Sequence, residues 1–275
     1  METTENRLMD EARHEPVKNV FRLGWEFIIV NRTLALMTVA AFVLLTLLEL
    51  VPIVGLAASV AVGVFAQSVQ IYVGRAFAEA ASIDAFLSEA RLTTLSTFLT
   101  RYQAPAFGAW LGWFVISMGA FIIWMTLALS AGFDPTMLEE SIADEAQLMA
   151  LMEAMGLSLL PVLLIGLLII YVYPIAQGRV ILSDTFGDAF KAVFSVFLPS
   201  VWKAAAEGEY FRFLFVFGLA LLGIGMLVGI AMMLLFLIPL FGPILFALLT
   251  AGLFYVMFLV MAIASVLARS MVEAF

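Results

Sequence analysis

The fold is decided by residues 33–74, which read TLALMTVAAFVLLTLLELVPIVGLAASVAVGVFAQSVQIYVG and contain one charged residue, Glu49. A single helix over these 42 residues would extend about 63 Å, roughly twice the hydrocarbon thickness of a bilayer. Pro52 stops a helix, and Gly55 permits the positive φ that a tight reversal needs. The stretch therefore predicts two membrane spans, at about 33–51 and 53–74, joined as a helical hairpin.

The same apolar pattern recurs along the rest of the chain. Four further stretches with few or no charges lie at about 104–130, 156–177, 211–238 and 240–267. The last two are joined by a similar turn containing Pro239 and Gly242. The runs are continuous and not alternating, which favours helices over transmembrane strands. We expect an all-α, six-span membrane domain at 27–270, preceded by a cytoplasmic N-terminal segment at 1–26.

The composition excludes several classes of protein. Hydrophobic residues make up 64% of the 275 residues and charged residues 12%, with a mean hydropathy of +1.12. A water-soluble domain is about 45–50% apolar and roughly 25% charged, and a disordered chain is less hydrophobic still. The net charge of −8 argues against nucleic acid as a partner. With no cysteine and a single histidine, we expect no metal site, no cofactor and no enzymatic activity.

The basic residues predict the orientation in the membrane. All 13 fall before span one, between spans two and three, between spans four and five, or after span six: Arg7, Arg13, Lys18, Arg22 and Arg32; Arg75, Arg91 and Arg101; Arg179, Lys191, Lys203 and Arg212; and Arg269. Lysine and arginine accumulate on the cytoplasmic side of membrane proteins. Both termini are therefore predicted to be cytoplasmic, in the cell (inner) membrane. The first 26 residues are polar, so no cleavable signal peptide is expected.

Short matches within the chain indicate an internal repeat. Gly74-Arg75 and Asp84-Ala85-Phe86 recur as Gly178-Arg179 and Asp188-Ala189-Phe190, both at an offset of 104. The predicted unit is an interfacial helix, a span out, a turn and a span back, ending in a small residue and an arginine. Because each unit holds two spans, the three hairpins would be parallel repeats, not the inverted repeats of many transporters.

Two segments, 82–101 and 184–207, fit amphipathic helices at the inner interface. In the second, an apolar face lies beside Lys191 and Lys203; its members are Phe186, Phe190, Val193, Phe194, Phe197 and Trp202. Such a helix either lies at the headgroup boundary or packs on the cytoplasmic ends of the spans. The candidate lipid headgroup contacts are Arg75, Arg179, Lys191, Lys203 and Arg269.

Polar residues inside the spans are few and carry two interpretations. Gln67 and Gln70 in span two, and Tyr171, Tyr173 and Gln177 in span four, form a candidate inner vestibule. The alternative is that they hydrogen-bond between helices and belong to an aromatic belt. Glu49 is either a solvated residue at the outer end of span one or a carboxylate that lines a cavity.

Two further patterns concern packing and the outer surface. Small residues spaced by four predict close helix contacts; they are Gly55, Ser59 and Gly63; Ala104, Gly108 and Gly112; and Gly225 and Gly229. The acidic segment 134–155 is expected to form an amphipathic helix on the outer surface, with a site for a cation or a basic partner as the alternative.

The motifs also carry a resemblance. Asp188-Ala189-Phe190-Lys191, Trp202 and the turn Leu237-Ile238-Pro239-Leu240-Phe241-Gly242 resemble a broad group of six-span prokaryotic membrane proteins without an agreed activity. This group includes the YciC-like proteins and the membrane domain of some glycerophosphodiester phosphodiesterases, and it implies fold and location only.

The function expected from these patterns is a non-enzymatic membrane scaffold or accessory subunit that organises a membrane complex or lipid environment. The alternative is a transporter or channel for a small or lipidic solute. The expected partners are membrane lipids, with another membrane protein or a second copy of the chain as further candidates.

Overall fold

A computed structural model describes residues 7–130, 145–235 and 242–273, and all regular structure within these ranges is helical. Five helical segments are long and apolar enough to cross a membrane. They are α4 (Val54–Glu79), α7 (Gln103–Ser130), Leu159–Ile181 within α9 (Glu145–Ile181), α12 (Gly208–Leu235) and Ile244–Val272 within α13 (Gly242–Val272). The chain is therefore a polytopic, all-helical membrane protein with five to six candidate spans.

The sixth candidate span is a bent pair of helices. The pair consists of α2 (Pro16–Val30) and α3 (Arg32–Leu48), which meet at 96°. Asn31 forms the corner: its Oδ1 accepts from the Leu34 amide at 3.0 Å, and its Nδ2 donates to two carbonyls of the segment that follows α4. With 17 residues, α3 is about 26 Å long, slightly less than the hydrocarbon thickness of about 30 Å.

The N-terminal helices pack on the bundle. Helix α1 (Arg7–His14) is tied to α13 by Arg13, which donates to the Ser270 carbonyl at 2.6 Å. Helix α2 buries Val20, Leu23 and Phe27, so the boundary predicted between residues 26 and 27 lies inside a packed helix.

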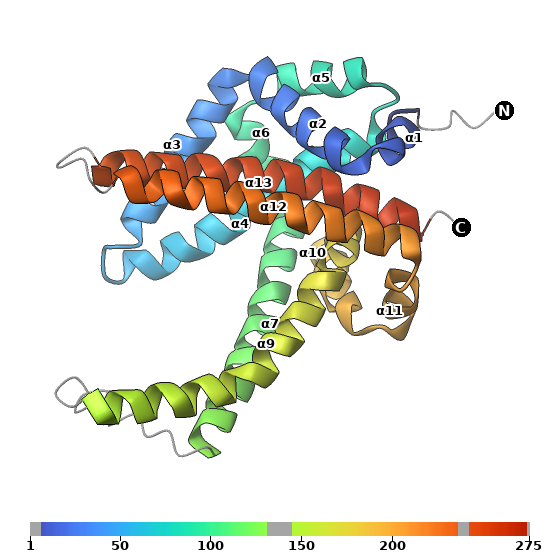
Figure 1. Ribbon diagram of the computed structural model, residues 1–275. Coiled ribbons are helices and arrows are strands. Elements are labelled where there is room, and N and C mark those ends of the chain that lie inside the picture. The colour runs from blue at the N-terminus through green and yellow to red at the C-terminus, as the bar shows by residue number, and fades with distance from the viewer. Residues whose placement is uncertain (1–6, 131–144, 236–241, 274–275) are drawn as a thin grey trace.

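Helix α13 is the centre of the packing. It contacts α9 most extensively, then α4, and also α2, α3 and α12, while α7 packs against α4 and α9. Figure 1 shows α12 and α13 side by side, with α3 and α4 next to them and with α7 and α9 running obliquely away. The buried core is thus shared by the three spans α4, α9 and α13.

The first hairpin turn forms where it was predicted, but glycine is not the residue with positive φ. Ile53 has φ of 69°, a region that β-branched residues rarely adopt. Gly55 is required for a different reason: a Cβ on it would lie 2.4 Å from the Glu49 carbonyl oxygen. The turn is closed by the Gly55 amide, which donates to the Val51 carbonyl at 2.7 Å. The second predicted turn, apart from Gly242, lies outside the described residues.

The acidic segment is described only from Glu145 onward. From there α9 is continuous into the span, with Pro161 and Pro174 inside it. The part of the predicted surface helix that the structure describes is therefore joined to the span and does not form a separate helix. Residues 134–144 lie outside the described residues.

Short helices connect the spans at one end of the bundle. They are α5 (Ile83–Leu92), α6 (Leu95–Thr100), α10 (Phe186–Val193), a 3₁₀ helix (Phe194–Phe197) and α11 (Pro199–Ala205). Each predicted interfacial helix is therefore broken. The first breaks where Thr94 caps α6, and the second breaks before Pro199, which cannot donate a backbone hydrogen bond.

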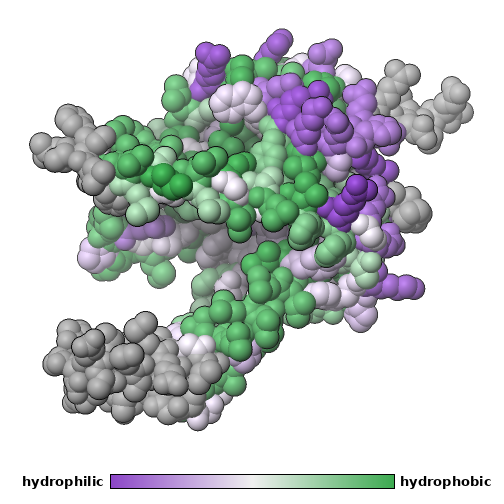
Figure 2. Space-filling model, in the orientation of Figure 1, coloured by the Kyte–Doolittle hydropathy of each residue, from purple (hydrophilic) through white to green (hydrophobic). Residues whose placement is uncertain are grey.

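Polar residues collect at the same end. Here Arg75, Arg179 and Arg269 lie near the C-terminal ends of α4, α9 and α13, and we refer to this end of the bundle as the basic end. Figure 2 shows hydrophilic residues gathered on the side where both termini lie, whereas most of the rest of this face is apolar. The opposite end, which carries Glu49 and the first hairpin turn, is referred to as the distal end.

Candidate functional site

An amide cluster joins α4 to α9 inside the bundle. Gln67 and Gln70 are three residues apart on α4, and Tyr173 and Gln177 are four apart on α9, so each pair shares one helix face. The Nε2 of Gln177 donates to Gln67 Oε1 at 2.8 Å and lies 3.3 Å from Gln70 Oε1. Trp113 of α7 donates its indole N–H to Gln177 Oε1 at 3.2 Å. Three spans therefore meet at one glutamine.

The centre of the cluster is buried, whereas Gln67 and Tyr173 are partly exposed. Gln177 is 0% exposed and Gln70 is 4% exposed. Tyr173 directs its hydroxyl to Gln70 Oε1 at 3.5 Å, and its ring lies 4.9 Å from that of Trp113. Four of the five predicted vestibule residues are thus together and bonded to one another. None of these four residues lines either of the cavities described below.

Tyr171 lies apart from the amide cluster. Its hydroxyl donates to the Ala205 carbonyl of α11, and its ring meets Tyr210 of α12 edge-on at 5.5 Å. Tyr210 in turn donates to the Tyr171 carbonyl. Tyr171 therefore connects α9 to the segment that leads into α12.

Arg75 links the basic ends of α4 and α9. Its guanidinium donates to the Ile181 carbonyl at 2.8 Å and to the Ser183 carbonyl at 2.6 Å, and it pairs with Asp184 at 2.7 Å. The Arg75 side chain is only 12% exposed. This predicted headgroup contact is therefore directed at protein atoms.

Arg179 and Arg269 share one carboxylate. Both place Nε 2.5 Å from an oxygen of Glu273, which directly follows α13. Partial burial raises the pKa of Glu273, but hydrogen bonds from Arg269 and Arg179 and their positive charges lower it more, so the pKa is below its ordinary value of 4.5. Glu273 therefore holds the ends of α9 and α13 together in its ionised form.

This arrangement predicts an acid-dependent stability. A carboxyl whose folded pKa is depressed stabilises the fold above its ordinary pKa of 4.5, and this contribution is lost as the pH falls through the lower folded value. Glu273→Gln is expected to cost about 1 kcal/mol near pH 7 and almost nothing once the pH lies below the folded pKa of Glu273. Thermal unfolding across this pH range measures the difference. Glu207→Gln, at an exposed position, is the control, and an equal loss for both variants at neutral pH would contradict the prediction.

Lys191 and Lys203 differ from these arginines. Both are exposed, and within the described part of the chain neither forms an ion pair. Large apolar side chains are exposed on the same connecting segment: Phe186 at 38%, Phe197 at 57% and Leu198 at 47%. We refer to these five residues as the lysine surface. Two of the five predicted headgroup contacts are therefore free to face a membrane surface.

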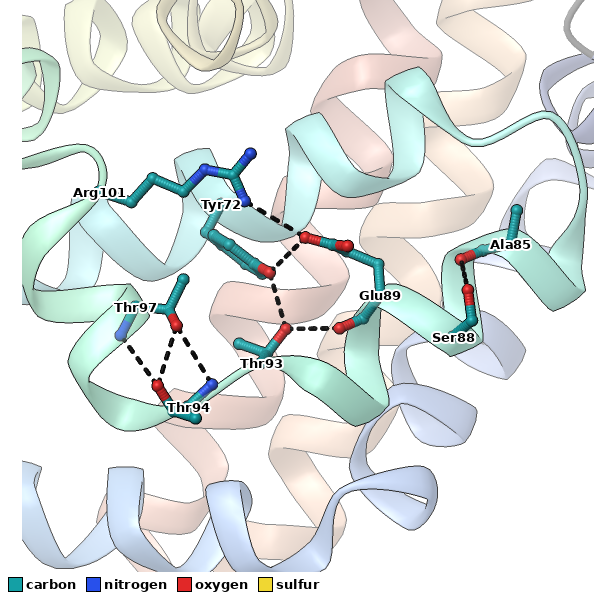
Figure 3. Close-up of polar contacts among 8 residues, drawn as sticks. All are labelled: Tyr72, Ala85, Ser88, Glu89, Thr93, Thr94, Thr97 and Arg101. Atoms are coloured by element: carbon teal, nitrogen blue, oxygen red, sulfur yellow. Dashed lines mark hydrogen bonds and ion pairs between the residues drawn. The ribbon is translucent and has the colours of Figure 1, made fainter.

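A second polar cluster at the basic end was not predicted from the sequence. Figure 3 shows Tyr72 donating its hydroxyl to Glu89 at 2.8 Å and lying 2.8 Å from the Thr93 hydroxyl, while Arg101 pairs with Glu89 at 3.3 Å. The Arg101 guanidinium also lies over the rings of Tyr72 and Tyr102. Tyr72, Glu89 and Arg101 contribute to the wall of a cavity of about 360 Å³.

The cluster around Tyr72 holds the first connecting segment against α4. The signal in the sequence was weak, because Glu89 and Arg101 are 12 residues apart and lie on opposite sides of a helix break. Glu89-x-x-x-Thr93 is one helical turn, which places both side chains on one face.

The predicted stripes of small residues have mixed outcomes. A Cβ on Gly63 would lie 2.2 Å from the Trp110 ring, and one on Gly108 would lie 2.2 Å from the Phe186 carbonyl oxygen. Close approach is therefore confirmed for α4 and α7. The expectation is wrong for Gly225 and Gly229, because no described atom lies within 4 Å of either added Cβ. Helix α12 lies on the periphery of the bundle, so its small residues do not bring a neighbouring helix close.

No group of three or more potential ligands for a metal ion occurs among the described residues. No protein-family model, curated protein or solved structure matches the chain. The resemblance to six-span prokaryotic membrane proteins therefore stays a prediction.

Proposed function

We propose that this protein is a non-enzymatic membrane scaffold or accessory subunit, with its basic end in the cytoplasm of a prokaryotic cell. In this proposal the lysine surface organises the surrounding lipid or a partner complex. The observation that carries the proposal is that Lys191 and Lys203 are exposed on the same connecting segment as the exposed side chains of Phe197 and Leu198.

The chemistry of that surface suits an anionic membrane. Exposed phenylalanine and leucine side chains enter the boundary between headgroups and acyl chains, and a lysine near an anionic surface contributes about 1 kcal/mol. The rings of Phe186, Phe190, Phe194 and Phe197 follow one another at centroid distances of 5.1–6.4 Å. The apolar strip is thus continuous along the connecting segment.

The experiment replaces both lysines by glutamate in the full chain. The protein is reconstituted in nanodiscs that contain phosphatidylcholine and phosphatidylglycerol, and phosphatidylglycerol bound to the protein is measured by native mass spectrometry after release. The variant loses two favourable lysine contacts of about 1 kcal/mol each. We therefore expect phosphatidylglycerol to be retained at least about 30-fold more weakly.

The matched control is Arg22→Glu with Arg91→Glu, which changes the charge equally at two other exposed positions. Retention in the control is expected to fall much less than in the lysine variant. Equal loss in both would show that net charge alone governs retention, and unchanged retention in the lysine variant would remove the lysine surface from the function.

The second candidate function is a transporter or channel for a small or lipidic solute. It requires the amide cluster to face a solute path, whereas the bonds of Gln177 to Gln67, Gln70 and Trp113 favour a joint between helices. A liposome flux assay separates the two. If the double variant Gln67→Leu with Gln70→Leu remains folded but abolishes solute flux, a transport function is favoured over the scaffold function.

A further inference from the structure

An apolar groove of about 560 Å³ lies among α3, α4 and α13 towards the distal end, away from the lysine surface. Fourteen residues line it, from Phe42 on α3 to its C-cap Glu49, from Val62 to Ala66 on α4, and from Phe246 to Phe258 on α13. Pockets for small ligands typically measure about 300–1,000 Å³, with apolar walls and few polar groups. This groove has the size and composition of a ligand site.

Small residues on two walls create the groove. Gly63 and Ala66 line it from α4, and Ala247 and Ala251 line it from α13. Trp110 on the other side of α4 excludes a larger residue at Gly63. The floor is aromatic, since the ring of Phe42 lies 4.8 Å from Phe65 and 5.5 Å from Phe258. The space is therefore built into the helix packing.

The groove has the length of a short apolar chain. From Phe246 to Phe258 the α13 wall rises about 18 Å, more than half of the hydrocarbon thickness of about 30 Å. Both α4 and α13 are candidate spans, so we expect the groove to lie at the depth of the hydrocarbon. An apolar chain that is already dissolved in the bilayer has no hydration shell to lose on binding. Such a chain therefore suits this site.

The polar groups that line the groove indicate the chemistry of the ligand's headgroup. Glu49 is the one ionisable residue among the lining residues, and it is exposed at the C-terminal end of α3. A carboxylate without a basic neighbour in the lining attracts a cation and repels a phosphate or sulfate.

We propose that this groove binds an amphiphile with an apolar chain and a cationic amine headgroup. The chain lies along α13 with its end on the Phe42 floor. The ammonium group pairs with Glu49 at the distal membrane surface. This site is separate from the lysine surface, and its test is independent of the proposed scaffold function.

The test uses dodecylamine that carries a photoreactive diazirine in its chain. The intact protein in phosphatidylcholine nanodiscs is labelled by light, and the modified residues are located by mass spectrometry. Labelling is expected to saturate with concentration and to map to α3 and α13 residues of the groove. Dodecyltrimethylammonium should compete for this labelling, whereas dodecyl sulfate with the same chain length should not.

Four variants separate binding in the groove from general exposure to lipid. Ala247→Trp fills the groove and is expected to reduce saturable labelling at least about 10-fold, whereas Ala231→Trp, on the exposed face of α12, should leave it unchanged. Thr46→Trp, at an exposed position on the α3 wall, also fills the groove. It serves as a second filling variant if Ala247→Trp does not fold. Glu49→Gln should weaken binding of the amine about 5-fold, the upper range for an exposed ion pair.

Several results would overturn the proposal. Labelling that never saturates, or that spreads evenly over all lipid-facing helices, would mean that bulk lipid alone covers this face. Equal competition by the amine and the sulfate, or no effect of a correctly folded filling variant, would also reject the site. Tighter binding of the sulfate than the amine would reject the cationic headgroup.

Discussion

Replacing Gly178 by leucine is expected to separate α9 from α13 and to destabilise the protein by about 3 kcal/mol. A Cβ on this residue would lie 2.5 Å from the Ser265 carbonyl oxygen and 2.7 Å from the Arg269 Cβ. Backbone cannot move aside as a flexible side chain can, so the two helices must separate. Because α9 and α13 form the most extensive contact in the bundle, the separation disturbs the core that α4, α9 and α13 share.

The control is Gly166→Leu on the same helix. Nothing lies within 4 Å of a Cβ at Gly166, so the substitution gains the same helix propensity without a clash. Thermal unfolding in detergent is expected to shift down by roughly 10 °C for Gly178→Leu and to stay the same or rise for Gly166→Leu. Equal melting temperatures would show that α9 and α13 do not pack through this glycine.

Replacing Arg75 by methionine is expected to release the end of α9 from α4. Methionine keeps an apolar stem of similar length but leaves the Ile181 and Ser183 carbonyls and the Asp184 carboxylate without the guanidinium. Hydrogen bonds from a charged group contribute about 1.5–3 kcal/mol each, so we expect a loss of about 3 kcal/mol. The free energy of unfolding and the rate of proteolysis between α9 and α10 measure it.

Arg75→Lys tests the geometry separately from the charge. An ammonium group cannot reproduce the fork that reaches two carbonyls and a carboxylate, so lysine is expected to restore less than half of the loss. Arg91→Met is the matched control, because Arg91 is exposed on α5. A loss for Arg75→Met no larger than that for Arg91→Met would contradict the proposed link between α4 and α9.

The spans were predictable because each combines length with hydrophobicity. From α4 to α13, continuous apolar runs and helix-breaking residues located every candidate span to within several residues. The first span was harder, since α3 is short and α2 bends into it at Asn31. The side chain of Asn31 bonds to residues about 60 positions away, and no local pattern reveals such partners.

The functional residues were predictable only in part. The alignment of Gln67 and Gln70 with Tyr173 and Gln177 followed from helical spacing and their equal depth in two spans. The choice between a vestibule and a joint between helices depends on side-chain directions, which spacing does not determine. Glu49 was recognised as either solvated or cavity-lining, and its place in the groove depends on small residues of α4 and α13 that are distant in sequence.

The central claim is that the interior of the bundle is closed and that its lysine surface meets lipid. A structure by electron cryomicroscopy in nanodiscs with phosphatidylglycerol tests both parts at once. We expect Gln177 to be bonded to Gln67 and Trp113 without a water channel, and headgroup density to lie against Lys191 and Lys203. A continuous water-filled path through Gln67 and Gln70 to both membrane surfaces, with no lipid ordered on the lysine surface, would contradict this claim.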